Sequence, residues 1–174
     1  MILGEKLSSL LQGGDVVLLD GDLGAGKTHF AKGVAKGVGV EQALTSPTFN
    51  LVLEYPLAKG LLFHDEKNSV ETGQNEVQPP RLLRHFDLYR LECAEQLEDI
   101  DYFGLIEQSD AVSLVEWGSK FSESLPLDYL LIQIEVDSGH DNARTLELSA
   151  RGARAEELLS RYAVVIPTEV EQHE

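Results

Sequence analysis

The sequence predicts an α/β fold: a three-layer sandwich in which helices cover both faces of a mixed sheet with a parallel core and antiparallel strands. Three observations predict it. A glycine-rich loop near the start of the chain joins a short apolar run to a helical pattern. Further apolar runs of strand length follow, with a helical pattern between them. Two strand patterns separated by a turn-rich stretch near the end indicate an antiparallel hairpin.

The first part of the chain carries four predicted elements. Apolar residues at helical spacing from Leu3 to Leu11 predict a helix that Gly13-Gly14 ends. The run Val16–Asp20 predicts a buried strand. Apolar or small residues then recur at helical spacing over 30–38, and residues 49–55 predict another strand.

The second part begins with a polar stretch rich in glycine and proline at about residues 57–81, which predicts a surface insertion. Beyond it we expect strands at 85–89 and 111–115, and a helical segment at 92–108 that breaks near Phe103-Gly104. A hairpin of strands at 129–136 and 144–149 and a helix at 153–162 follow. We expect residues 1–174 to form a single domain with an acidic tail that frays from about residue 167.

Composition excludes several classes of function. The formal net charge is −16 over 174 residues, so the surface repels a polyanion such as RNA. No apolar run approaches the length of a membrane span, and the single cysteine excludes an internal disulfide and a cysteine-based zinc site. We therefore expect a cytoplasmic protein that contacts no membrane and reaches nucleic acid only through other proteins.

Residues 21–28, Gly-Asp-Leu-Gly-Ala-Gly-Lys-Thr, match the phosphate-binding pattern G-x-x-x-x-G-K-[ST] without a break. The glycines let the backbone turn its N–H groups toward phosphate oxygens, and the following helix adds the positive end of its dipole. Lys27 supplies a charge for the terminal phosphates, and the Thr28 hydroxyl is a ligand for Mg²⁺. The motif predicts a P-loop NTPase-like fold. The predicted nucleotide-binding residues are Asp22, Leu23, Gly24, Ala25, Gly26, Lys27, Thr28 and His29.

Hydrolysis would also need an acid near the metal and a group that positions water, and two acids compete for these roles. Asp87 lies on a predicted strand whose alternation puts His85, Asp87 and Tyr89 on one face. Glu116 directly follows a buried strand, at the carboxyl edge where ligands bind in such sheets. We predict Lys27, Asp87 and Glu116 as catalytic residues. Thr28, Glu116 and Asp87 are the predicted metal ligands, and the sequence does not decide which acid contacts Mg²⁺ directly.

Two further features each have a functional and a structural interpretation. Thr45, Ser46, Pro47 and Thr48 form a hydroxyl-rich loop. This loop is either a switch that senses the terminal phosphate or a turn that caps its own backbone. Trp117 either stacks on a base or a partner, or packs within the fold.

Four segments, in this order, resemble the TsaE family, the ATPase of tRNA threonylcarbamoyladenosine biosynthesis. They are residues 21–30, Thr45-Ser46-Pro47-Thr48-Phe49, His85-Phe86-Asp87-Leu88-Tyr89-Arg90-Leu91 and Val115-Glu116-Trp117. The resemblance covers about residues 3–150 apart from the insertion. His29 replaces a second threonine common in the family, and the link between Tyr55 and His85 is longer than usual by about twenty residues.

The resemblance implies a slow, partner-stimulated ATPase that requires Mg²⁺, binds ATP and ADP, and acts with TsaD and TsaB. It would reset that assembly without being the transferase, and tRNA would be reached only through the partners. Carried over, residues 24–28 hold the phosphates, Thr28 and Glu116 hold Mg²⁺, residues 46–49 act as a switch and Asp87 supports hydrolysis.

Two other functions stay open at this point. One is a small-molecule P-loop kinase, for which Arg81 and Arg84 are the only candidates for a basic lid. The other is a nucleotide-dependent regulatory protein that does not depend on hydrolysis.

Overall fold

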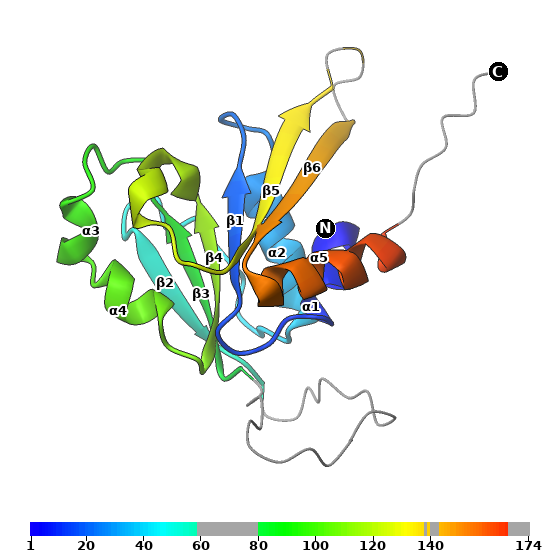
Figure 1. Ribbon diagram of the computed structural model, residues 1–174, viewed down its shortest axis with the longest axis horizontal. Helices are drawn as coiled ribbons and strands as arrows, with labels where there is room; N and C mark the ends of the chain where they lie inside the picture. The colour runs from blue at the N-terminus through cyan, green and yellow to red at the C-terminus, as the bar shows by residue number, and fades with distance from the viewer. Residues whose placement is uncertain (59–79, 138, 140–142, 167–174) are drawn as a thin grey trace.

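A computed structural model describes residues 1–58, 80–137, 139 and 143–166 (Figure 1). Within these residues, six strands form one sheet in the order β2-β3-β4-β1-β5-β6. They are β1 (Val16–Asp20), β2 (Val52–Pro56), β3 (Leu82–Asp87), β4 (Ala111–Glu116), β5 (Tyr129–Val136) and β6 (Arg144–Arg151). The four central strands run parallel, and β2 and β6 pair antiparallel at the two edges. The predicted mixed sheet with a parallel core and a terminal hairpin is confirmed.

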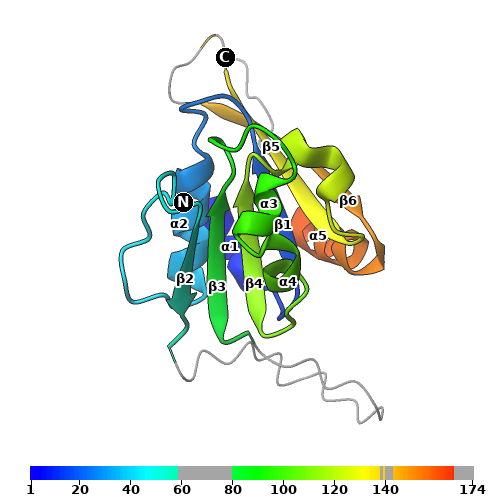
Figure 2. The same ribbon diagram turned by 90° about the vertical axis from the view of Figure 1, so that its left-hand side faces the viewer.

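Helices cover both faces of this sheet, which confirms the predicted three layers (Figures 1 and 2). One face carries α1 (Ile2–Ser8), α2 (Lys27–Gly37) and α5 (Ala153–Val165). The other face carries α3 (Gln96–Asp99), α4 (Tyr102–Ile106) and the short 3₁₀ helix η1 (Gly118–Ser124). None of the helices within the described ranges has the length and apolar character needed to cross a membrane.

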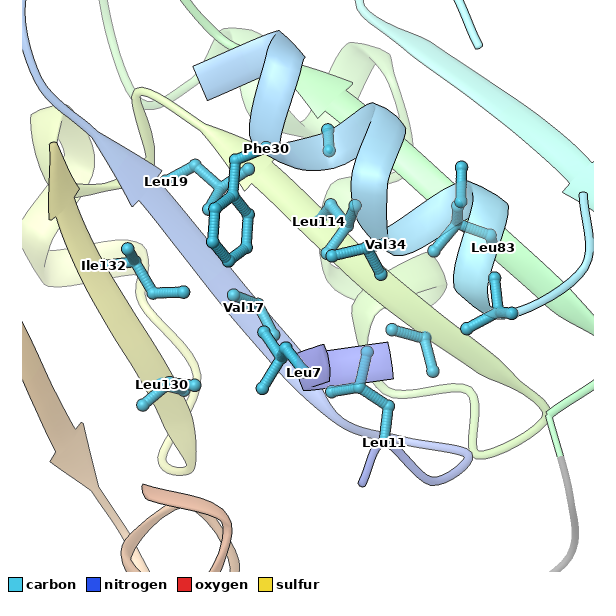
Figure 3. Packing of buried hydrophobic residues seen from close by; sticks show 14 of the residues in the cluster. Leu7, Leu11, Val17, Leu19, Phe30, Val34, Leu83, Leu114, Leu130 and Ile132 are labelled. Carbon is cyan, nitrogen blue, oxygen red and sulfur yellow. The ribbon is translucent and has the colours of Figure 1, made fainter. Parts of the chain in front are cut away.

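Each face of the sheet has its own apolar core. Val17 and Leu19 of β1 pack against α1 and α2, as Figure 3 shows, together with Phe30 and Val34. Val16 and Leu18 alternate with them and belong to the core under α3 and α4. Because both faces of β1 are covered, all five of its residues are buried, and its first four form a continuous apolar run.

Two strands begin at other residues than the sequence predicts. The strand expected at 49–55 begins only at Val52, because the N–H groups of Asn50 and Leu51 turn back to the carbonyl of Pro47. Leu51 accordingly has a positive φ of 64°. The strand expected at 85–89 is Leu82–Asp87. It can include Arg84 because the buried guanidinium donates hydrogen bonds to acceptors outside the strand.

The helical predictions also need correction. The segment 92–108 breaks at Asp101, with φ 52°, and not near Phe103-Gly104. The first helix ends at Ser8, before the glycine pair, and the hydroxyls of Ser8 and Ser9 bond to carbonyls one turn back. η1 has no counterpart in the sequence-based prediction. Most of the predicted insertion at 57–81 and the tail from about 167 lie outside the described residues.

The parallel core gathers acidic residues at one edge of the sheet. β1, β3 and β4 end on Asp20, Asp87 and Glu116, in that order. Asp87 and Glu116 are paired in register on neighbouring strands, and Leu19 is the β1 partner of Glu116. Since parallel strands end on the same side, this carboxyl edge is where the loop at 21–26 and its neighbours assemble a site.

Candidate functional site

The loop between β1 and α2 is shaped by three glycines with positive φ: 135° at Gly21, 83° at Gly24 and 115° at Gly26. A Cβ at Gly21 would lie 2.1 Å from the carbonyl oxygen of Ile134, so the loop crosses β5 at backbone distance. A Cβ at Gly24 or Gly26 would meet nothing within 4 Å, so the inner side of the loop is open. This open cradle, at the N-terminus of α2, fits a phosphate group.

Lys27, the first residue of α2, is 4% exposed. Its Nζ donates to the carbonyl oxygens of Gly21 and Asp22, at 2.7 and 2.8 Å. It also lies 4.1 Å from the centroid of the Trp117 ring. Burial lowers the pKa of Lys27, and the nearby carboxylates, led by those of Glu116 and Asp87, only partly oppose this shift. The ammonium is therefore a desolvated charge that donates to the loop carbonyls. A bound phosphate would compete with these carbonyls for it.

The second polar residue of α2 contacts the end of β4. Oγ1 of Thr28 donates to Oε1 of Glu116 at 2.8 Å. The same oxygen lies 2.8 Å from Nε2 of His85, which is fully buried on β3. The predicted metal ligands Thr28 and Glu116 thus meet in one hydrogen-bonded group.

Asp87 instead contacts the predicted switch loop. Its Oδ2 accepts hydrogen bonds from Ser46 Oγ at 2.9 Å and Thr48 Oγ1 at 2.6 Å. Its Oδ1 accepts from the backbone N–H of Tyr89 at 3.2 Å. Tyr89 lies in the turn beyond β3, so the prediction that it shares a strand face with His85 and Asp87 is wrong. The hydroxyls at 46 and 48 do not only cap their own loop, because they bond to an acid across the site.

These groups line one cavity of about 310 Å³. It is lined by Leu23, Gly24, Gly26, Lys27, Thr28, His29, Ser46, Thr48, Asp87, Tyr89, Glu116 and Trp117. Four predicted residues are not among these. Asp22 lines a neighbouring cavity, Ala25 is buried in the core, and Pro47 is also buried. The backbone N–H of Thr45 donates to the Tyr55 hydroxyl, which in turn donates to the Thr45 carbonyl.

Trp117 forms part of the wall of this cavity. It is half-buried, with a φ of 64°, and its ring contacts that of Tyr89 at a centroid distance of 5.2 Å. Its other neighbour is the ammonium of Lys27. The structure thus gives Trp117 packing contacts inside the site, and its predicted stacking on a base or partner remains a prediction.

Two residues near the site have no role in the sequence-based prediction. His85 is predicted to share a strand face with Asp87, but its contact with Glu116 depends on the pairing of β3 with β4. Arg144, at the start of β6, donates from Nε to the carbonyl of Ala25 at 2.8 Å across 119 residues. No local pattern marks Arg144, because only the fold of the hairpin brings it to the loop.

The donors available for a divalent cation are hydroxyl and carboxylate oxygens. Across the described part of the chain, no three His, Cys, Asp or Glu side chains are grouped as an all-protein metal cage requires. Mg²⁺ is bound in proteins by one or two carboxylates together with water and substrate phosphates. The Thr28 hydroxyl and the Glu116 carboxylate, beside an open phosphate cradle, match that donor set.

Comparisons with known proteins agree on one family. Residues 1–146 match the family model of the threonylcarbamoyl adenosine biosynthesis protein TsaE. A tRNA threonylcarbamoyladenosine biosynthesis protein TsaE of Streptomyces coelicolor is 37% identical over 155 residues, covering 87% of this chain and 90% of its own. The Bacillus subtilis protein of that name is also 37% identical, with 86% and 80% covered. The crystal structure of Bacillus subtilis YdiB superposes with a TM-score of 0.61 at 31% identity, covering 93% of this chain and 85% of that one.

Proposed function

Because the chain belongs to the TsaE family, we propose that it is a Mg²⁺-dependent ATPase required for threonylcarbamoyladenosine modification of tRNA. The observation that carries the proposal is the hydrogen bond between Thr28 and Glu116. It joins the hydroxyl of the phosphate loop to a carboxylate at the end of β4, which is the pair of donors that Mg²⁺–nucleotide binding needs.

Each part of the site has a proposed task. The loop at 22–27 cradles the phosphates, and Lys27 moves its ammonium from the loop carbonyls to their oxygens. Thr28 and Glu116 would hold Mg²⁺, which would supply positive charge to stabilise the phosphoryl group. Asp87, at the neighbouring strand end, orients the water that attacks. Ser46 and Thr48, held by Asp87, form the switch that responds to the terminal phosphate.

Two exposed apolar side chains beside the site support action through partner proteins. Leu23 and Phe49, 78% and 81% exposed, come from the phosphate loop and the switch loop. An apolar residue on each loop can make contact with another protein when the nucleotide reorders both loops. We propose TsaD and TsaB as those proteins, with tRNA bound by them, since the net charge of −16 disfavours direct RNA binding. The cytoplasmic location stays a prediction from the sequence.

The proposed nucleotide binding is tested with Lys27→Ala against Lys32→Ala, an exposed lysine on the same helix. Calorimetric titration with ATP and Mg²⁺ should show binding by the parent and the Lys32 variant and none by Lys27→Ala. An unchanged affinity of Lys27→Ala for ATP would contradict the proposal.

Hydrolysis is tested separately with Asp87→Asn, in a reconstituted modification assay containing TsaB and TsaD. The variant should bind ATP and support one round of modification but not repeated rounds. Repeated rounds at the parental rate would favour the alternative of a regulatory protein for which hydrolysis is dispensable.

The kinase alternative loses its candidate lid. Arg84 is buried at 2% exposure and bonded to Glu54, and Arg81 precedes β3 at the edge opposite Asp87. Neither residue lines the cavity at the phosphate loop.

A further inference from the structure

His85 is a fully buried polar residue to which the proposed mechanism gives no task. It lies on β3 between Leu83 and Asp87 and faces the α2 side of the sheet, where the surrounding core is apolar. Its Nε2 is 2.8 Å from Oε1 of Glu116, and its Nδ1 has no partner in the described part of the chain. Burying an imidazole with one of its two nitrogens unpaired disfavours folding, so packing alone does not explain a histidine here.

The two donors that reach Glu116 converge on the same oxygen. Thr28 approaches Oε1 from α2 and His85 approaches it from β3, both at 2.8 Å. No hydrogen bond within the described residues reaches Oε2, although Glu116 lines the cavity. The carboxylate is thus held by one oxygen and leaves the other for whatever the cavity contains.

The two donors differ in how firmly they are fixed. The Thr28 hydroxyl rotates about one bond and is itself a proposed metal ligand. The His85 ring is enclosed, with 0% exposure, so its direction is set by the fold. Of the two donors, His85 is therefore the one that can hold the Glu116 side chain in the same place whether or not a nucleotide is bound.

We propose that His85 is a positioning residue for the metal site: its Nε2–H donates to Oε1 of Glu116 and so presents Oε2 to the cation or to its bound water. This rests on the proposed function. Because a carboxylate only accepts hydrogen bonds, the contact requires a proton on Nε2 of His85.

The tautomer is tested on the protein without nucleotide. Nitrogen-detected proton NMR correlations of the imidazole should show the proton on Nε2 of His85. A proton on Nδ1 alone would overturn the proposal, because the ring would then offer no donor to Glu116. This measurement needs no variant and does not depend on whether the protein binds ATP.

The positioning role is tested by comparing His85→Gln with His85→Leu. A glutamine amide can replace the Nε2–H donor, whereas leucine fills the space without one. Loss of such a partner typically lowers metal affinity by roughly 10- to 100-fold. We expect His85→Leu to raise the Mg²⁺ concentration needed for half-maximal ADP binding by roughly that factor, and His85→Gln to recover most of it.

Two controls separate the possible failures. ADP affinity measured in EDTA and the thermal midpoint should be similar in the two variants, since the phosphate loop is unaltered. If both variants require the same Mg²⁺ concentration and the parent still binds ADP, the positioning role of His85 is overturned but the proposed function is not. A parent that binds no nucleotide would instead overturn the proposed function, while the NMR result would still decide whether His85 orients Glu116.

Discussion

Thr28 and Glu116 are separated by 88 residues in the chain, yet Oγ1 of Thr28 donates a 2.8 Å hydrogen bond to Oε1 of Glu116. The contact joins the first turn of α2 to the last residue of β4. Both elements are fixed by the core, since Phe30 and Val34 of α2 pack with Leu114 of β4. The hydroxyl and the carboxylate are therefore brought together by the fold before any ligand is present.

We expect Thr28→Val and Glu116→Gln each to weaken Mg²⁺-dependent ATP binding by roughly 10- to 100-fold. Because the two side chains would act on one cation, the double variant should lose much less than the sum of the two free-energy changes. Calorimetric titration of the parent, the two single variants and the double variant, with Mg²⁺ and with EDTA, measures this double-mutant cycle. Thr145→Val, at an exposed position on β6, is the matched control. Additive losses would contradict a shared site.

The switch loop should depend on Asp87 for its order. Thr48→Val removes a 2.6 Å hydrogen bond to Asp87 Oδ2 and keeps the side-chain shape. A bond to a charged acceptor is worth about 1.5–3 kcal/mol, so amide exchange over residues 45–50 should be roughly 10- to 100-fold faster. Mass-spectrometric hydrogen exchange measures this, with β5 as the unaffected reference. Unchanged exchange in the loop would show that its backbone turn holds it without Asp87.

The residues of the site that the sequence predicts best are those whose role follows from a local pattern. The loop 21–28 and its helix form one contiguous motif, and Glu116 directly follows an apolar strand. Parallel pairing then places the ends of β1, β3 and β4 at one edge, which a βα pattern makes predictable. The sequence predicts Thr28 and Glu116 as ligands of one cation, and the structure brings the two side chains into hydrogen-bonding contact.

The rest of the site depends on register and on distant turns. His85 meets Glu116 only because β3 pairs with β4 so that Asp87 lies opposite Glu116. Arg144 reaches Ala25 from the end of a hairpin. The start of β3 could not be predicted either, because a charged residue is not expected inside a buried strand. Nothing near Arg84 in the sequence indicates that Glu54 and Gln108 accept hydrogen bonds from its guanidinium. Such contacts between distant residues have no periodic signature.

Arg84 should matter for stability and not for nucleotide binding. It donates to Glu54 at 2.6 Å, to the carbonyl of Leu105 at 2.7 Å and to Gln108 at 2.5 Å, and so ties β2 and the end of α4 to β3. Arg84→Met keeps the apolar stem but leaves these acceptors without their donor. We expect a loss of about 2–3 kcal/mol, at the lower end for a broken buried pair because Glu54 is half exposed and can be hydrated.

Urea unfolding measures the effect of Arg84→Met, with the exposed neighbour Arg81→Met as control. ATP affinity should be unchanged, because Arg84 does not line the phosphate cavity. A stable Arg84→Met variant would show that the contacts of the guanidinium do little more than offset its burial.

Burial of Lys27 should make the stability of the protein depend on pH in the alkaline range. The pKa of Lys27 lies below its usual 10.5, chiefly because the ammonium is desolvated, with the neighbouring carboxylates acting in the opposite direction. Between that lowered pKa and 10.5, the unfolded chain binds a proton that the folded chain has released. Raising the pH through this window therefore stabilises the folded state, and below it the full penalty of the buried charge remains.

Lys27→Met removes this titration at nearly constant volume, and Lys32→Met, on the exposed side of α2, is the control. The free energy of unfolding, measured in urea from about pH 7 to about pH 10, should rise for the parent relative to Lys27→Met. The parent and Lys32→Met should show no such divergence, because that lysine is exposed in the folded chain as it is in the unfolded one. A difference between the parent and Lys27→Met that stays flat or falls with pH would contradict the lowered pKa, because the ammonium would then be at least as well stabilised in the loop as in water.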